Sequence, residues 1–128
     1  MRQHTIRVIA DVARRYAVDG IHIDDYFYPY PQNGERFNDG RSNESRRAVV
    51  DSFVQNMYSQ IKRTKPWARV GISPFGIWKP GVPSSTTAGL NAYEDLGCDA
   101  RKWLANGWCD YMAPQLYWRI NGPQSYTA

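Results

Sequence analysis

The chain has 128 residues and a formal net charge of +4, with 42% apolar and 22% charged residues. This length suffices for one domain with a hydrophobic core, but not for a complete (β/α)8 barrel, which needs about 250 residues. The basic residues are scattered among acidic ones, which argues against a nucleic-acid partner, and no run of about 18 apolar residues could span a membrane.

The first half of the chain predicts two helices around one short strand. Apolar residues recur at three- and four-residue spacing over residues 3–17, which indicates an amphipathic helix. A short apolar strand is predicted over 21–26. Residues 27–44 are rich in Pro, Gly, Asn and Asp and predict a long loop. Helical spacing returns over 45–64, and Pro66 ends this second helix.

The second half repeats the pattern of strand, loop and helix. A strand is predicted over 69–75, followed by a loop over 76–92 that is rich in Pro, Gly, Ser and Thr. One continuous helix is predicted over 93–106 and a third strand over 110–118. The tail after Asn121 is expected to be a loop.

This regular alternation of helices and strands predicts an α/β fold with three parallel strands and right-handed crossovers. The connections before the strands are short, whereas those after the first two strands are long. In parallel α/β folds the loops after the strands build the functional site. We therefore expect the site at the carboxyl ends of the strands.

Polar side chains share one face of the predicted strands. Because side chains alternate along a strand, His22, Asp24 and Tyr26 point away from the face that packs on the helices. Ser73 and Gln115 occupy the same face of the next two strands. A carboxylate on such a face needs a function or a partner, because an unpaired buried charge is costly.

One function for a carboxylate at a strand end is the hydrolysis of glycosidic bonds, which commonly uses two carboxyl groups. Asp24 is the first candidate, although it could instead cap the following loop or pair with an arginine. The second could be Asp25, Glu94 or a residue outside this chain. Alternation points Asp25 the other way, and Glu94 could simply be an acid at a helix start. His22 could orient Asp24 or be a core histidine.

Aromatic residues follow the predicted strands, where they could rim a cleft and stack on the apolar faces of sugar rings, or instead fill the core. The predicted substrate-binding residues are His22, Tyr26, Tyr28, Ser73, Trp78, Gln115, Tyr117 and Trp118.

The two cysteines, Cys98 and Cys109, lack the spacing of metal ligands, so we expect no metal site. They could be free thiols or form a disulfide. No Gly-rich phosphate loop occurs, and we expect no cofactor.

The chain resembles the glycosyl hydrolase-like 10 family of bacterial proteins over essentially its whole length. Three motifs carry the resemblance: DGIHIDDYFYP at 19–29, GISPFGIW at 71–78 and APQLYW at 113–118. The resemblance implies a TIM-barrel catalytic domain of which residues 1–128 form an incomplete part, with strands corresponding roughly to the fourth to sixth of eight.

The same resemblance implies cleavage of O-glycosidic bonds, with peptidoglycan glycan strands or a related polysaccharide as substrate. It also implies export to the cell envelope, although Met1 is not followed by a signal-peptide pattern. The alternative function is a non-catalytic carbohydrate-binding barrel. Three strands cannot close a barrel, so we expect these residues alone to be poorly stable, to associate or to be inactive.

A more distant similarity links the first strand to the family 18 chitinases, whose motif reads Asp-Gly-x-Asp-x-Asp-x-Glu. Asp19, Gly20 and Asp24 match it, whereas His22 replaces the middle Asp and Tyr26 replaces the acidic Glu. This departure argues against a chitinase-type acid on this strand.

Overall fold

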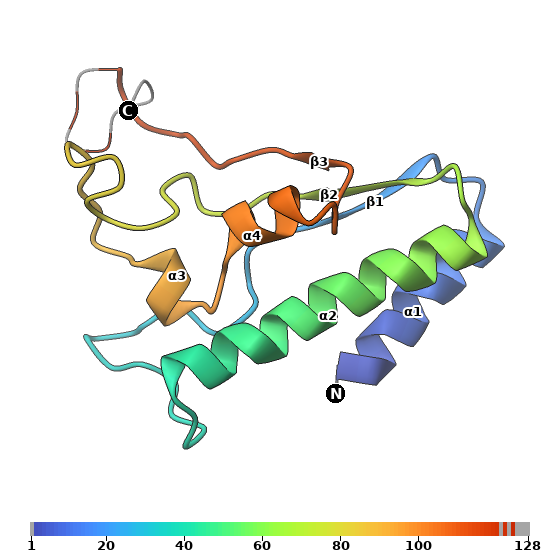
Figure 1. The fold of residues 1–128 in the computed structure, drawn as a ribbon, viewed down its shortest axis with the longest axis horizontal. Helices are drawn as coiled ribbons and strands as arrows, with labels where there is room; N and C mark the ends of the chain where they lie inside the picture. Colours follow the sequence, from blue (N-terminus) through green and yellow to red (C-terminus); the bar gives the residue numbers. More distant parts are fainter. Residues whose placement is uncertain (1, 121, 123, 125–128) are drawn as a thin grey trace.

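In the computed structural model, which describes residues 2–120, 122 and 124, the chain forms three strands and four helices. The elements are α1 (Arg2–Arg15), β1 (Gly20–Ile23), α2 (Asn43–Thr64), β2 (Arg69–Ile72), α3 (Ala92–Asp95), α4 (Ala100–Ala105) and β3 (Tyr111–Met112). The helices lie on one side of the strands and leave the other side of the sheet uncovered (Figure 1).

The strands form one open sheet in the order β1-β2-β3, and both pairs are parallel. Gly20 to Ile23 pair in register with Arg69 to Ile72, and Gly71 pairs with Tyr111. The predicted parallel α/β alternation is thus confirmed. It is consistent with part of a TIM barrel, although the described strands do not close into one.

The strands are shorter than predicted. β1 stops at Ile23, and β2 stops at Ile72, where Pro74 soon follows and cannot donate to the sheet ladder. β3 has only two residues. A parallel bridge between Phe75 and Gln115 nevertheless keeps the segments after β2 and β3 side by side. The loop predicted after Asn121 lies largely outside the described residues.

The single helix predicted over 93–106 is wrong, because the segment forms two short helices. Gly97 takes the left-handed conformation, with φ of 67°, which ends α3. The side chains of Asn91 and Asp99 each accept a backbone N–H at the start of α3 and α4. Because these two N-cap residues stand eight positions apart, each begins its own short helix.

The hydrophobic core lies between the sheet and the helices. The side chains of Val54, Met57 and Ile61 on α2 are fully buried, as are those of Val70 and Ile72 on β2. The strand face expected to pack on the helices does so, because Ile21 and Ile23 also contact this core. The predicted alternation of strand faces is thereby confirmed.

The two long connections lie together at the carboxyl ends of the strands, opposite the short ones (Figure 1). The connection after β1 is tied to α2 by the buried Arg46. Its guanidinium donates to the Asp39 carboxylate at 2.9 Å and to the Phe37 carbonyl at 2.5 Å. These two hydrogen bonds fix the connection after β1 to α2, near the carboxyl ends of the strands.

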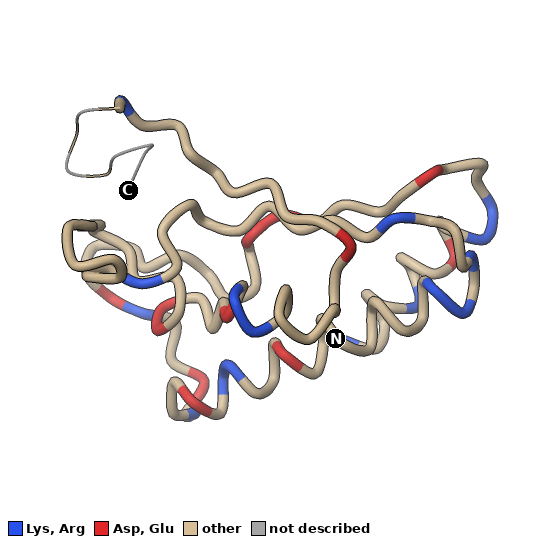
Figure 2. The backbone as a smooth tube through the Cα atoms, turned by 45° about the horizontal axis from the view of Figure 1, so that its top comes forward, with Lys and Arg blue, Asp and Glu red and all other residues tan. Residues whose placement is uncertain are grey.

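Basic and acidic positions are interspersed along the described chain (Figure 2). Several of them form ion pairs between elements, such as Lys102 on α4 with Asp51 on α2 at 2.6 Å. No helix in the described part of the chain is long and apolar enough to cross a membrane.

Candidate functional site

Asp24 lies directly after β1 and is exposed on the side of the sheet away from the helices. Its Oδ1 accepts hydrogen bonds from Gln115 Nε2 at 2.5 Å and from the backbone N–H of Asp25 at 3.0 Å. The Gln115 amide also donates to the Ser73 carbonyl at 3.2 Å. One amide group thus links the ends of all three strands and orients the Asp24 carboxylate.

Gln115 reaches Asp24 because the chain after β3 continues beside the chain after β2. The Gln115 N–H donates to the Pro74 carbonyl at 3.0 Å, next to the bridge between Phe75 and Gln115. The structure therefore brings together three of the predicted site residues, Asp24, Ser73 and Gln115, from three different strands.

His22 lies one alternation before Asp24, on the same exposed face. Its Nε2 is 2.8 Å from Ser73 Oγ, and its Nδ1 is 3.0 Å from the Tyr111 hydroxyl. The imidazole is therefore held between hydroxyl groups from β3 and from the end of β2. Ser73 also connects His22 to the Gln115–Asp24 pair, because the Ser73 carbonyl accepts from the Gln115 amide.

Tyr111 is the residue of this group that the sequence interpretation missed. Its ring crosses the middle strand at Gly71, where an added Cβ would lie 2.1 Å from Tyr111 Cζ. A glycine in the middle of a strand often marks a close approach of another group, and this signal was available in the sequence. It did not identify the group that approaches.

Asp25 lies apart from this group. Its side chain is buried, with 1% relative exposure, and Oδ2 accepts a hydrogen bond from the Tyr30 hydroxyl. Burial, followed by this hydrogen bond, raises the pKa of Tyr30 above its ordinary value. The strand end therefore does not twist the Asp25 side chain onto the exposed face that carries Asp24.

Glu94 is also placed elsewhere than expected. On α3, its Oε2 accepts from Arg47 at 2.8 Å and from Asn43 at 2.9 Å, both on α2. Burial by itself would raise the pKa of Glu94, but these two hydrogen bonds lower it below the ordinary value. Glu94 therefore fastens α3 to α2, and the structure does not bring it to Asp24.

Two of the predicted aromatic residues are held by hydrogen bonds within the protein. Tyr28 is buried and donates to Asp39 at 3.1 Å. Trp78 donates from Nε1 to Asp99 at 3.1 Å and packs edge-on against Tyr93, with ring centroids 5.1 Å apart. These hydrogen bonds fix the Tyr28 and Trp78 rings to neighbouring segments, and their contact with substrate stays a prediction.

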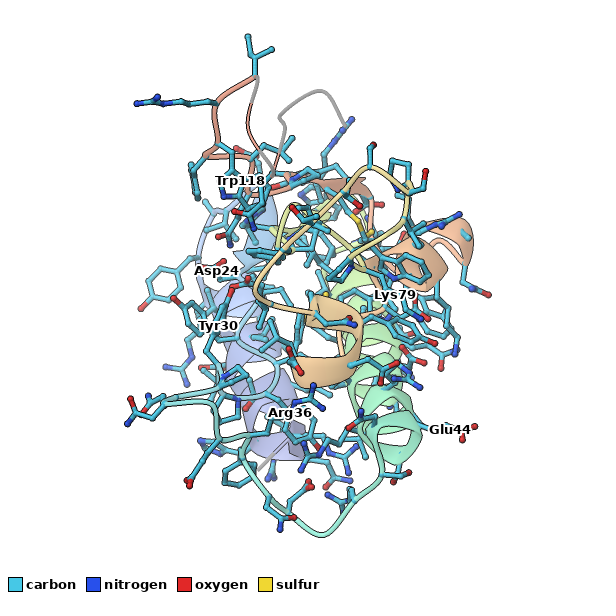
Figure 3. The ribbon with its side chains drawn as sticks, turned by 90° about the vertical axis from the view of Figure 1, so that its left-hand side faces the viewer. Asp24, Tyr30, Arg36, Glu44, Lys79 and Trp118 are labelled. Carbon is cyan, nitrogen blue, oxygen red and sulfur yellow. The ribbon has the colours of Figure 1, made fainter. Side chains whose placement is uncertain are left out.

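The other aromatic candidates remain accessible. Tyr26 is 74% exposed and Tyr117 is 86% exposed. Trp118 packs edge-on against Phe75, with centroids 5.3 Å apart. Viewed toward the strand ends, Trp118 and Asp24 lie along the same side of the molecule, with Lys79 across from them (Figure 3). These rings are therefore available to a ligand beside Asp24.

Both cysteines are free and buried. Burial, with a further contribution from the Asp25 charge, raises the pKa of the Cys98 thiol. Within the described residues, no three His, Cys, Asp or Glu side chains gather as metal ligands.

Comparison with known proteins matches residues 1–126 to the family described as Glycosyl hydrolase-like 10. The chain is 38% identical, over 135 aligned positions, to Glycosyl hydrolase YngK of Bacillus subtilis (strain 168), covering 93% of this chain and 26% of that protein. It is 34% identical, over 125 positions, to Glycosyl hydrolase DigH of Escherichia coli (strain K12), covering 87% and 28%. The chain thus spans about a quarter of the length of these relatives.

Proposed function

The chain belongs to the glycosyl hydrolase-like 10 family, and from this premise we propose that it supplies part of the active site of a glycoside hydrolase that cleaves O-glycosidic bonds. The observation that supports this proposal most directly is the exposed Asp24 carboxylate, held by Gln115 at the strand ends. Relatives named glycosyl hydrolases support the same reaction class.

The geometry favours a role for Asp24 as nucleophile or base. Both hydrogen bonds found to its carboxylate among the described residues end on Oδ1, and in both the partner is the donor. Within the described part of the chain no hydrogen bond to Oδ2 is found, so this oxygen is available to a substrate or a water, as a nucleophile or base needs.

The second carboxyl group is proposed to come from another part of the complete protein. Asp25 is buried against Tyr30, and Glu94 is paired with Arg47. Since the relatives are about four times as long as the matched segment, they have ample sequence to provide a proton donor.

The proposed substrate is a glycan strand of peptidoglycan or a related polysaccharide, which would require the protein to act in the cell envelope. Exposed rings at Tyr26 and Tyr117 suit the apolar faces of successive sugars, and Gln115 and Ser73 offer hydrogen-bonding groups beside them.

The test is a chimera in which these 128 residues replace the matched segment of the Bacillus subtilis relative. We expect the chimera to release sugar fragments from purified peptidoglycan, and Asp24→Asn to lower that rate by at least about a hundredfold, because the ionised group is lost. Glu44→Gln, at an exposed position at the start of α2, removes the same charge away from the site and serves as the control.

Near-normal hydrolysis by Asp24→Asn, in a chimera that melts cooperatively, would overturn the assignment of Asp24. The alternative function is a non-catalytic carbohydrate-binding protein, and the engagement of both Asp25 and Glu94 elsewhere favours it. It predicts that the parent chimera binds glycan strands without cleaving them and that Asp24→Asn keeps its affinity.

A further inference from the structure

His22, Ser73 and Tyr111 form a chain of two hydrogen bonds. Which group donates in each bond decides whether the Ser73 hydroxyl can donate to a ligand. A neutral imidazole has one donor nitrogen and one acceptor nitrogen, whereas each hydroxyl can donate or accept. The chain can therefore run in two ways. Either Tyr111 donates to Nδ1 and Nε2–H donates to Ser73, or Ser73 donates to Nε2 and Nδ1–H donates to Tyr111.

The chemistry of the two hydroxyls selects the first direction. A phenol, with an ordinary pKa of about 10, is a stronger acid than an aliphatic alcohol and hence the better donor to an imidazole nitrogen. In this direction Ser73 Oγ accepts from His22 and keeps its own proton free. Asp24, two residues after His22, lies on the same exposed face and can receive a ligand beside this proton.

The sheet leaves space for the Tyr111 ring at Gly71. Gly71 stands between His22 and Tyr111 in the strand register, and only a residue without a side chain leaves room for the Tyr111 ring. The His22 and Tyr111 rings lie 5.6 Å apart at an angle of 30°. The phenol thus reaches across the whole middle strand to the imidazole.

We propose that Tyr111 is a positioning residue, which holds His22 as the Nε2–H tautomer and thereby makes the Ser73 hydroxyl a hydrogen-bond donor beside Asp24. The acceptor would be a sugar oxygen of the glycan, and this last part rests on the proposed function. The Ser73 hydroxyl then donates a hydrogen bond to the ligand, whereas Asp24, the main group of the site, accepts one.

The tautomer can be read directly by NMR in the 128-residue chain with 15N-labelled histidine, at a concentration at which sedimentation velocity shows the chain to be monomeric. The chain has two histidines, and the exposed His4 on α1 is an internal reference. At about pH 8, above the ordinary imidazole pKa of about 6.5, we expect His22 to show a protonated Nε2 and an acceptor Nδ1, and His4 to show an averaged pattern.

Removing the phenol oxygen should change this signature. In Tyr111→Phe we expect the Nδ1 shift of His22 to move toward that of His4, with unchanged circular dichroism. Tyr117→Phe, at an 86% exposed ring, removes the same atom elsewhere and should leave both histidines unchanged. A protonated Nδ1 in the parent chain, or a His22 spectrum that Tyr111→Phe leaves unaltered, would overturn the proposal.

A second measurement separates this proposal from the proposed function. With a β-1,4-linked N-acetylglucosamine tetrasaccharide as probe, Ser73→Ala and Tyr111→Phe should each weaken binding about three- to tenfold, and the double variant no further. Additive losses would contradict a shared hydrogen bond. If the parent binds no tetrasaccharide, the glycan role of Ser73 falls with the proposed function, and the NMR result still decides the tautomer.

Discussion

At the scale of single residues, two adjacent carboxylates have opposite environments. Asp24 is exposed and accepts from Gln115, whereas Asp25 has 1% relative exposure and accepts from Tyr30. Strand alternation accounts for this division, because successive side chains leave the sheet on opposite sides. The motif that contains both residues therefore presents only Asp24 to the open face.

The contact between Gly71 and Tyr111 gives a prediction at this scale. We expect Gly71→Ala to displace the Tyr111 ring and to lower the free energy of unfolding by about 1 kcal/mol, measured by urea denaturation. In a Tyr111→Ala background the added methyl group has room. Gly71→Ala should then be neutral or slightly stabilising, since glycine within a strand costs about 0.5–1 kcal/mol relative to alanine.

Gly89→Ala is the control for this pair, because a Cβ at Gly89 would meet nothing within 4 Å. Equal effects of Gly71→Ala in the two backgrounds would show that the Tyr111 ring does not occupy the space over Gly71.

At the scale of elements, polar ties between the connections and α2 define the strand-end region. Asp39 in the connection after β1 receives hydrogen bonds from the Arg41 backbone, the Arg46 guanidinium and the Tyr28 hydroxyl. Burial alone would raise the pKa of Asp39, but these partners lower it to about 2. The connection is thereby held to α2 by a charged group and not by apolar packing alone.

A pH dependence follows from this lowered pKa. The contribution of Asp39 to stability is fully present above its ordinary pKa of about 3.9 and is lost as the pH falls through about 2. We expect Asp39→Asn to lower the free energy of unfolding at pH 7 and to flatten its decline between about pH 4 and 2. Urea titrations across this range measure both effects.

Glu35→Gln removes the same charge from an exposed position of the same connection, and it should leave the acid dependence unchanged. An Asp39→Asn variant with the parent's decline in acid would show that other carboxylates are responsible.

At the scale of the whole molecule, the helices cover one face of the sheet, while the face with Asp24 and His22 is open. β1 and β3 are both edges of the three-stranded sheet. Such edges present unpaired backbone groups to other chains. We therefore expect the 128 residues alone to associate and to show no hydrolysis.

Sedimentation velocity over a range of concentrations tests this expectation. Ala113→Lys places a charge directly after β3, on an exposed residue at the sheet edge, and should reduce association. Ala17→Lys adds the same charge at an exposed position before β1 and should not. A parent chain that stays monomeric at every concentration would contradict edge pairing.

The sequence by itself determined the order of elements, the parallel sheet, the faces of the strands and the family, since these depend on local periodicity and on contiguous motifs. The strand faces predicted for His22, Asp24, Ser73 and Gln115 all hold in the structure. Local patterns report which way a side chain leaves its own strand, because alternation is a property of the backbone.

Only the tertiary structure decided which of these side chains meet. The attachment of Glu94 to Arg47, 47 positions away, depends on a segment distant in sequence. The same holds for Tyr111, whose contact with His22 spans 89 positions. Hydrogen bonds of this kind are set by the packing of elements in space, which no local pattern in a single sequence encodes.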